Sequence, residues 1–409
     1  PGPDVGTTDD AMKTTAIENG LEGALSKTVD MGGNRIDQLG AAAQSVFVAI
    51  NTLLGEIDRL KILPQFADLS LPGEEGLSVL IQGFGAVGAH AAKLLDEADY
   101  PARITGVSDV SGYLYDEAGL PVPELLQMQS QKGAVAYPYY REKLDGQRFA
   151  PTKYSNDSND LLRESAYCLV PAAPIANYLD VDAASKPSMT VDRMGKWTMI
   201  VEGANTYSPD PARRAARCRM ERTVYWQKGV LIATDFLVNS GGVIYAAQER
   251  LIPAPDHLQI PAEFLGHRQA VDGWLASHKE EFAALAEQRR IAGQEMLQQA
   301  IRLNMQELVD LLVSDADMLP CEAAERIAVD RIASSESDRT VADVMVPMAT
   351  ILESQSVREA AELLIADQGD LLGVVSESGE LLGVVTDWDI TDATATGCGD
   401  DVPVSQIMS

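Results

Sequence analysis

Between residues 77 and 245, short runs of apolar and β-branched residues alternate with stretches of helical periodicity. Three of these runs are Tyr167–Val170, Trp197–Val201 and Val230–Ala233. Continuous apolar runs of this length are typical of strands buried on both faces, and intervening helices are typical of parallel crossovers. The pattern therefore predicts an α/β fold built on a doubly wound parallel sheet with helices on both faces.

One turn in this region carries candidate chemistry. The run Val79–Ile81 leads directly into a glycine-rich turn, and a helical pattern continues from Ala89. In such a turn Gly83 permits the tight bend, Gly85 admits a pyrophosphate to the backbone, and Gly88 allows the helix to pack closely on the strand. The helix start would offer free N–H groups to phosphates. The residues predicted to bind a dinucleotide here are Gly83, Phe84, Gly85, Ala86, Val87 and Gly88. The alternative is a glycine-rich turn in an unrelated α/β domain.

The next predicted strand, Ile104–Ser108, ends at Asp109. A carboxylate at this position can bind the two hydroxyl groups of an adenosine ribose, and its charge repels the 2′-phosphate of NADP. The sequence therefore favours NAD as the cofactor, with NADP as the alternative.

Other patterns flank this region. Residues 9–64 are predicted to be mostly helical, and Leu69–Gly76 has the proline and glycine content of a linker. Residues 262–332 again show helical periodicity. A polar linker, Ser334–Asp338, precedes a small α/β unit that begins at Val341. The length of 409 residues leaves room for two or three domains.

Charge and composition narrow the class of protein. The chain has 32 basic and 61 acidic residues, a net charge of −29, and no basic run, which argues against nucleic-acid binding. It contains no apolar run long enough to cross a membrane and no signal peptide, so we expect a cytoplasmic protein without a membrane partner.

The four cysteines are scattered, with no C-x-x-C and no metal-ligand spacing, which predicts reduced thiols and no metal site. The abrupt start at Pro1-Gly-Pro-Asp4 suggests a fragment.

Seven segments, in order along the chain, resemble motifs of the glutamate/leucine/phenylalanine/valine dehydrogenases, and the set is most similar to glutamate dehydrogenases. They are Pro1–Thr7 (P-A-P-D-[VM]-G-T in the family), Ser26–Gly33 (T-G-K-P-x-x-x-G-G), Gln82–Gly88 (Q-G-F-G-N-V-G), Val107–Gly112 (V-S-D-S-x-G), Val170–Ala173 (I-P-A-A), Val201–Asn205 (V-E-G-A-N) and Asp235–Val243 (D-[IL]-x-[AV]-N-[AS]-G-G-V). Ala323–Ile332 resembles the closing helix of the family, so the resemblance extends from residue 1 to about 335.

The resemblance implies an activity and several residue roles. Enzymes of this family oxidatively deaminate an L-amino acid to a 2-oxo acid and ammonia and pass hydride to NAD or NADP. The reaction needs a base for protons from the amine and from water, together with cations for the α-carboxylate. By resemblance Asp4 is the catalytic carboxylate; the alternative is a turn-forming or helix-capping aspartate. Lys27 matches the lysine of T-G-K-P, and its alternative is a solvated surface lysine.

The same resemblance assigns residues that contact the ligands. Asn205 and Asn239 match asparagines near the nicotinamide and the substrate, with loop-capping amides as the alternative. Asn239 and Val243 are the implied substrate contacts. The residues added to the cofactor site are Ala172, Ala173, Asn205 and Asn239.

The chain also departs from the family. Ala86 replaces the usual Asn of the glycine turn, Ala246 stands where a substrate-contacting Ser is common, and Ala41 stands where a Thr is usual. The reactive lysines of the family lie upstream of the Asp4 motif, in a segment absent from residues 1–409. The three alanines favour the alternative of a dehydrogenase-like scaffold that binds nucleotides and has lost catalysis.

The C-terminal unit resembles a different family. Ser356–Leu364 has the periodicity of an amphipathic helix, Leu372–Val375 and Leu382–Val385 are predicted to pair as strands, and Thr386-Asp-Trp-Asp389-Ile follows. This order resembles one CBS module, with its G-[VI]-[VI]-T-x-x-D-[IL] signature. CBS modules work in pairs that commonly bind adenosine nucleotides, which implies contacts from Thr386 to phosphate and from Asp389 to ribose. The alternative is a structural or dimerising module without a ligand.

Together these patterns predict four regions: residues 1–68 as a remnant of a catalytic domain, 77–245 as a Rossmann-like domain, 246–335 as helices that return to the catalytic domain, and 340–409 as a CBS module whose pair is incomplete. The leading interpretation is an NAD-dependent glutamate dehydrogenase, forming a homo-oligomer and regulated by ATP, ADP or AMP. The alternative is a dehydrogenase-like nucleotide sensor that has lost catalysis.

Overall fold

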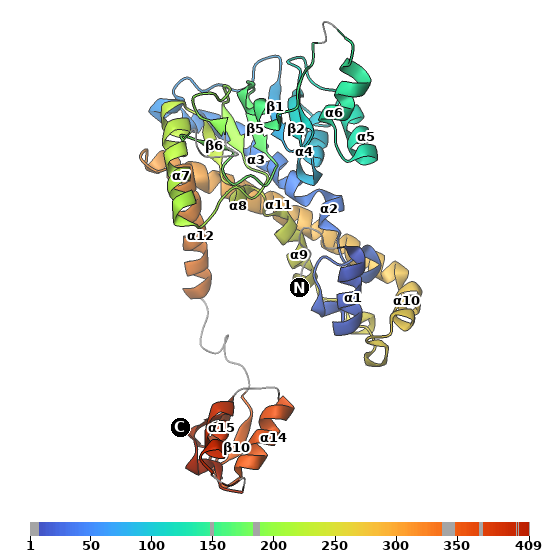
Figure 1. Cartoon of the computed structure of the whole chain (residues 1–409), viewed down its shortest axis with the longest axis vertical. Coiled ribbons are helices and arrows are strands. Elements are labelled where there is room, and N and C mark those ends of the chain that lie inside the picture. Colours follow the sequence, from blue (N-terminus) through green and yellow to red (C-terminus); the bar gives the residue numbers. More distant parts are fainter. Residues whose placement is uncertain are drawn as a thin grey trace. The chain divides into compact units, whose positions relative to one another are not determined.

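A computed structural model describes residues 8–147, 151–182, 189–337, 348–367, 371–397, 399 and 401–408. Asp4 and the segment Val341–Met345 lie outside these residues. The chain divides into two compact units, Pro1–Asp330 and Arg331–Ser409 (Figure 1). No described helix combines the length and the apolar composition needed to cross a membrane.

The helices of the first unit are α1 (Asp9–Asn19), α2 (Ile36–Leu39), α3 (Ala41–Leu60), α4 (Ala86–Asp96), α5 (Val122–Lys132), α6 (Ala136–Tyr139), α7 (Pro211–Glu221), α8 (Asp235–Val238), α9 (Gly241–Leu251), α10 (Arg268–Ser277), α11 (Lys279–Ser314) and α12 (Pro320–Ser337). The last turns of α12 lie beyond Asp330, where the first unit ends. Its strands are β1 (Leu77–Gln82), β2 (Ala102–Asp109), β3 (Gly112–Tyr115), β4 (Lys153–Ser155), β5 (Cys168–Pro171), β6 (Leu179–Asp180), β7 (Met189–Thr190), β8 (Met199–Val201) and β9 (Leu231–Ala233).

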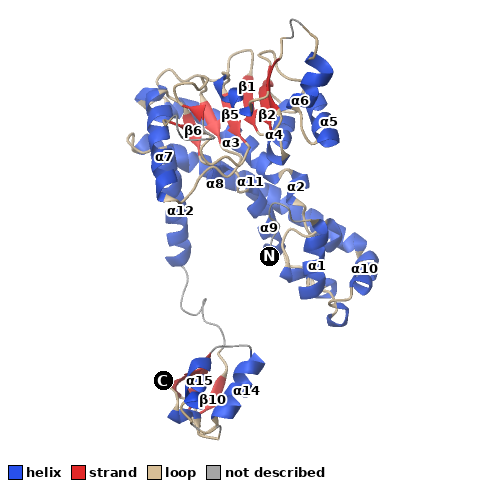
Figure 2. Ribbon diagram, in the orientation of Figure 1, coloured by secondary structure: helices blue, strands red, loops and turns tan. Residues whose placement is uncertain are grey.

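Seven of these strands form one sheet in the order β4-β3-β2-β1-β5-β8-β9. Figure 2 shows strands of this sheet in red, with helices around them in blue. The five strands from β2 to β9 run parallel, whereas β3 and β4 add an antiparallel edge. The predicted Rossmann-like, mostly parallel sheet is confirmed, and its strands fall on the predicted apolar runs because those runs are buried. The chain goes from β1 to β2 on one side and reaches β5 on the other, so β1 lies at the topological switch point where ligands bind.

A second hydrophobic core lies apart from the sheet and is built from segments that precede and follow the sheet in the chain. Its buried members are Met12, Ala16, Ile17, Leu21, Ala24, Met31, Leu258, Ile260, Val271, Leu275, Phe282 and Leu285. The 36-residue α11 joins the two cores, because Phe282 and Leu285 near its start belong to the second core and Leu297 and Leu312 farther along belong to the first. A helix of this length spans about 54 Å. It therefore fixes the segment before the sheet relative to the sheet itself.

The second unit is a small α/β fold with strands β10 (Thr350–Leu352), β11 (Leu371–Val375) and β12 (Leu381–Thr386) and helices α14 (Val357–Asp367) and α15 (Asp387–Ala395). β11 pairs with β10 in parallel and with β12 in antiparallel fashion, with Leu372 opposite Val385. The predicted helix and strand pair are confirmed. Their apolar residues form a separate core around Ile351, Ala360 and Val374.

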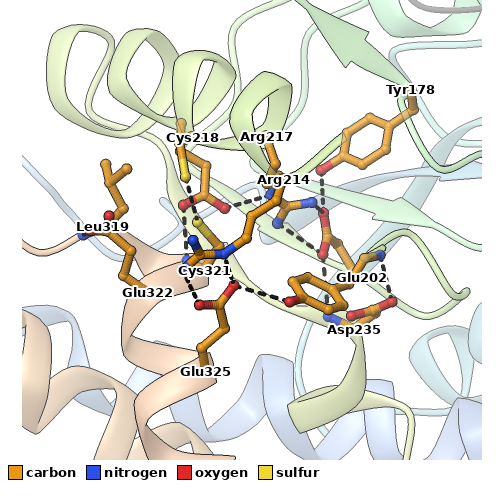
Figure 3. A network of polar contacts seen from close by, with 12 residues as sticks. Tyr178, Glu202, Arg214, Arg217, Cys218, Asp235, Leu319, Cys321, Glu322 and Glu325 are labelled. Atoms are coloured by element: carbon orange, nitrogen blue, oxygen red, sulfur yellow. Dashed lines mark hydrogen bonds and ion pairs between the residues drawn. The ribbon is translucent and has the colours of Figure 1, made fainter. Parts of the chain in front are cut away.

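A buried ion network stabilises the edge of the sheet beyond β8 (Figure 3). The guanidinium of Arg217 on α7 donates to both carboxylate oxygens of Glu202 at 2.6 and 3.0 Å and to Glu221 at 2.5 Å. Both glutamates are fully buried. Tyr178 Oη and the backbone N–H of Asp235 also donate to Glu202, at 2.6 and 3.2 Å. One buried cation thus neutralises two buried carboxylates: Glu221 on the same helix and Glu202 in the loop that follows β8.

We expect Arg217→Met to lower the free energy of unfolding by about 3–5 kcal/mol, because two buried carboxylates lose their cation. Burial raises the pKa of Glu221 and Arg217 lowers it, so the substitution should raise this pKa further. The folded variant would then bind a proton that the unfolded chain has released, and its stability should fall as pH rises from about 5 to 8. Urea unfolding across this range measures both effects. The exposed pair Arg163–Asp160 supplies the control, Arg163→Met, and an equal loss in both variants would contradict the account.

Candidate functional site

The glycine turn between β1 and α4 has the geometry of a phosphate-binding loop. Gly83 has a φ of +95°, and a Cβ there would lie 2.8 Å from the backbone nitrogen of Ala173. A Cβ at Gly88 would lie only 2.0 Å from the carbonyl oxygen of Gly83. At Gly85, by contrast, a Cβ would meet no atom within 4 Å. Two glycines therefore allow close packing and the third faces open space, and their roles toward a dinucleotide remain predictions.

The start of α4 leaves donors free for a ligand. Its N-cap is Gly85, which has no side chain to accept a hydrogen bond, and the first helical bond runs from Ala89 N–H to the Gly85 carbonyl at 2.9 Å. The turn is held in place by hydrogen bonds to the end of β2. Gly83 and Phe84 donate to the Ser108 carbonyl at the end of β2, at 3.0 and 2.8 Å. A helix start with unsatisfied N–H groups and the positive end of its dipole attracts phosphate.

Ala172 and Ala173 lie on the opposite side of this turn. Ala172 N–H donates to the carbonyl of Gln82 at 2.7 Å, and the close approach of Ala173 to Gly83 excludes any larger residue at that glycine. The structure thus brings these two predicted cofactor residues, which follow β5, against the glycine turn that follows β1. Both strands end at the switch point of the sheet.

Asp109 lies at the end of β2, as predicted, but its carboxylate is already engaged. Oδ1 accepts from the backbone N–H and hydroxyl of Ser111 at 2.8 and 2.5 Å. Oδ2 accepts from the N–H groups of Val135 and Ala136 at 2.5 and 3.2 Å. Asp109 therefore anchors the β2–β3 turn to the start of α6, and its contact with a ribose remains a prediction.

The two asparagines implied by the family motifs meet in the structure. Asn239 Nδ2 donates to Asn205 Oδ1 at 2.9 Å, although the two residues are 34 positions apart. Asn205 follows β8 and is exposed, whereas Asn239 ends the short helix α8. Val243, in the first turn of α9, is 73% exposed and is open to a ligand. The contact places these motifs at one edge of the sheet; their roles toward substrate and nicotinamide remain predictions.

A small apolar pocket of about 80 Å³ lies where four helices begin. Its walls come from the starts of α2, α3, α4 and α9, and α3, α4 and α9 have no side-chain cap at their starts. The lining residues are Ile36, Gly40, Ala41, Ala42, Ala43, Ala86, Val87 and Gly242. Ala41 and Ala86, two of the positions that depart from the family pattern, therefore line the same pocket. The sequence shows both substitutions but not their convergence.

Lys27 is not a solvated surface lysine. Its side chain is 4% exposed, forms an ion pair with Glu249 on α9 and donates to the Ala24 carbonyl at 2.7 Å. Burial lowers the pKa of Lys27, although Glu249 opposes this effect. Close by, the guanidinium of Arg289 donates from Nη1 to the Gly32 carbonyl and from Nη2 to the Ile252 carbonyl, each at 2.6 Å. These cations line a cavity of about 340 Å³ that lies away from the glycine turn, and they join the second core to α9 and α11.

In the second unit, Thr386 and Asp389 form the capping box of α15. Asp389 N–H donates to Thr386 Oγ1 at 3.2 Å, and Asp389 Oδ2 accepts from the Thr386 N–H at 2.8 Å. This arrangement stabilises the helix start on its own. A contact of either residue with a nucleotide remains a prediction.

Sequence reasoning missed the buried Glu202, Arg217 and Glu221 and the contact between Cys218 and Cys321. Glu202 belongs to the V-E-G-A-N motif, but its partner Arg217 lies in a polar helix that carries no motif. The only available signal was that Arg217 and Glu221 are spaced four residues apart on one helix.

Comparison with known proteins agrees with this geometry. The family described as Glutamate/Leucine/Phenylalanine/Valine dehydrogenase matches residues 62–315, and the CBS domain matches residues 341–395. A protein named glutamate dehydrogenase from Aeropyrum pernix is 36% identical over 178 residues, 44% of this chain and 35% of that protein. The NADP-specific glutamate dehydrogenase of Saccharolobus shibatae is 29% identical over 252 residues, 60% of this chain and 48% of that protein. The chain thus spans about half or less of these relatives.

Solved structures share the fold. The glutamate dehydrogenase of Plasmodium falciparum superposes with a TM-score of 0.50 over 83% of this chain and 61% of that one, at 15% sequence identity. The family match covers more than half of the chain, and the motifs Gln82–Gly88 and Val170–Ala173 lie together at the switch point of the sheet. The chain belongs to the glutamate/leucine/phenylalanine/valine dehydrogenase family and carries a CBS domain C-terminal to its dehydrogenase part.

Proposed function

We propose that this chain is the dinucleotide-binding part of an NAD(P)-dependent dehydrogenase that oxidatively deaminates glutamate to 2-oxoglutarate and ammonia. The observation that carries the proposal is the glycine turn, in which Gly83 and Gly88 bring the backbone together while Gly85 faces open space before an uncapped helix. Glutamate is proposed because curated relatives, among them those of A. pernix and S. shibatae, are named glutamate dehydrogenases.

The proposal assigns binding and catalytic roles to particular residues. The N–H groups at the start of α4 hold the pyrophosphate, and the nicotinamide, when bound, supplies the hydride acceptor. The amides of Asn205 and Asn239 lie at the same edge of the sheet and can donate to and accept from a polar ligand. Asp4 is proposed as the base that takes protons from the amine and from water. Lys27 is paired with Glu249, so it is not a free cation for the α-carboxylate.

For the cofactor we propose NAD, with NADP as the alternative. Asp109 lies at the end of β2, where a carboxylate disfavours a 2′-phosphate through its charge. The four hydrogen bonds that it accepts hold this charge in place. The S. shibatae relative is named NADP-specific, so relatives alone do not decide the choice.

A nucleotide sensor without catalysis is the second candidate. It is favoured by the convergence of Ala41 and Ala86 on one apolar pocket beside the glycine turn, where the family pattern has Thr and Asn. A pocket with these substitutions keeps the backbone donors of the helix starts but loses two polar side chains. Binding of a dinucleotide would survive this loss more readily than an oriented reaction.

The formation of NADH and NADPH by the full-length protein separates the two candidates. We expect NADH from glutamate, and rates at least about tenfold lower with leucine, valine and phenylalanine. The same assay with NADP measures the preference that Asp109 should impose. Measurable NADH binding without turnover of any of the four amino acids would favour the sensor.

For the CBS domain we propose binding of ATP, ADP or AMP and, through it, regulation of the dehydrogenase. The hydroxyl of Thr386 and the carboxylate of Asp389 lie together at the start of α15, where a helix dipole favours phosphate. Only Oδ2 of Asp389 takes part in the capping box, so Oδ1 can accept from a ribose hydroxyl.

Calorimetric titration of the protein with ATP, ADP and AMP tests this site. We expect Asp389→Asn to weaken the best of these ligands about tenfold, because the hydrogen bond from the ribose to a charged acceptor is lost. Asp387→Asn, in the same helix turn but outside the capping box, is the matched control. No binding of any of the three nucleotides, with unchanged kinetics, would rule the proposal out.

A further inference from the structure

Cys218 and Cys321 lie in contact although they are 103 residues apart in the chain. Cys218 is on α7 and Cys321 is the second residue of α12, and their sulfur atoms are 3.8 Å apart (Figure 3). Sulfur atoms in a disulfide are about 2.05 Å apart, so the thiols are unbonded but are held as neighbours. Nothing in the cysteine spacing of the sequence indicates this pair.

The two thiols differ in access and in chemistry. Cys218 is half-buried, whereas Cys321 is 1% exposed. Burial and the neighbouring carboxylate of Glu221 raise the pKa of the Cys321 thiol. Because the thiolate is the attacking form, a reagent from solvent should react first at Cys218. Cys321 is placed to complete the reaction from within the protein.

We propose that Cys218 and Cys321 form a reversible disulfide, and that the pair is a modification site for low-molecular-weight disulfides such as oxidised glutathione. The Cys218 thiolate attacks one sulfur of the oxidant, which forms a mixed disulfide and releases one thiolate. Cys321 then attacks the Cys218 sulfur, the protein disulfide forms and the second thiolate leaves. The two cysteine sulfurs are oxidised, the two sulfurs of the reagent are reduced, and the two cysteine protons pass to the leaving thiolates.

The disulfide would join α7 to the helix that closes the first unit. The same two helices are already bridged by Arg214, whose guanidinium makes two bonds to Glu325, and by the N–H of Cys321, which donates to Glu221 at 2.9 Å. Shortening the sulfur contact would act on the helix start whose N–H donates to Glu221. The covalent bond also closes a loop of 103 residues in the unfolded chain, which lowers its entropy.

A continuous set of contacts leads from this pair to the asparagines of the candidate site. Glu221 bonds Arg217, Arg217 bonds Glu202, and Glu202 accepts from the backbone of Asp235. The Asp235 carboxylate in turn accepts from the N–H of Thr206 at 2.6 Å, one residue after Asn205. We therefore expect the oxidation state of the cysteines to alter dinucleotide affinity. This coupling rests on the proposed function, whereas the disulfide itself does not.

The disulfide is tested by equilibrating the full chain in buffers of oxidised and reduced glutathione, alkylating the remaining thiols and mapping the peptides by mass spectrometry. We expect a cross-linked Cys218–Cys321 peptide, its loss on reduction, and a melting temperature raised by roughly 5 °C in the oxidised protein. In Cys321→Ser the reaction should stop at the mixed disulfide between glutathione and Cys218. Cys168→Ser, at a fully buried cysteine in β5, should keep the cross-link. A wild-type protein that carries only the adduct, or does not react, would overturn the proposal.

The coupling is tested by titrating NADH into the reduced and the oxidised protein. We expect affinities that differ about fivefold in the wild type and do not differ in Cys218→Ser. A cross-link without any change in affinity would overturn the coupling and leave the disulfide. A reduced protein that binds no NADH would count against the proposed function and leave the cross-linking result intact.

Discussion

The structure depends on the close packing of α4 against the end of β1. The N–H groups at the start of α4 can face a phosphate only if the helix comes close to the strand, and a Cβ at Gly88 would lie 2.0 Å from the Gly83 carbonyl. The same contact excludes larger residues at Gly83, because Ala173 closes the turn from the side of β5. At Gly85, between these two positions, an added Cβ would meet no atom within 4 Å. The order of the strands places this turn at the switch point of the sheet, where a ligand is accessible.

The rest of the first unit brings distant segments to this turn. The long helix α11 belongs to both hydrophobic cores and so holds the residues before the sheet beside those that follow it. Lys27 and Arg289 fix the loop around Gly32 to α9 through a buried ion pair and carbonyl contacts. Beside the sheet, Arg217 and its two glutamates hold the loop that carries Asn205. One group of buried charges beside the second core and another beside β8 thus fix loops of the first unit.

The sequence predicted what depends on local pattern. The apolar runs predicted the strands of the parallel sheet, and the glycine turn and the order of motifs indicated the family. Each of these signals lies within a short contiguous segment of the chain. Contacts across the fold could not be predicted in this way. The engagement of Asp109 with the start of α6, the burial of Lys27 and the meeting of Cys218 with Cys321 depend on which elements pack together. The convergence of Ala41 and Ala86 on one pocket is of the same kind, since each substitution alone carries no sign of the other.

Titration of NADH into Gly85→Ala, with Gly55→Ala as the matched control, tests the dinucleotide site most directly. Neither added methyl group meets a protein atom within 4 Å, so both variants should fold. Gly55 lies inside α3, away from the glycine turn, whereas Gly85 is the N-cap of α4. The account predicts that Gly85→Ala weakens NADH binding at least about tenfold, because the methyl group occupies the approach of the pyrophosphate, and that Gly55→Ala binds as the wild type does. Equal NADH affinity in the two variants would contradict it.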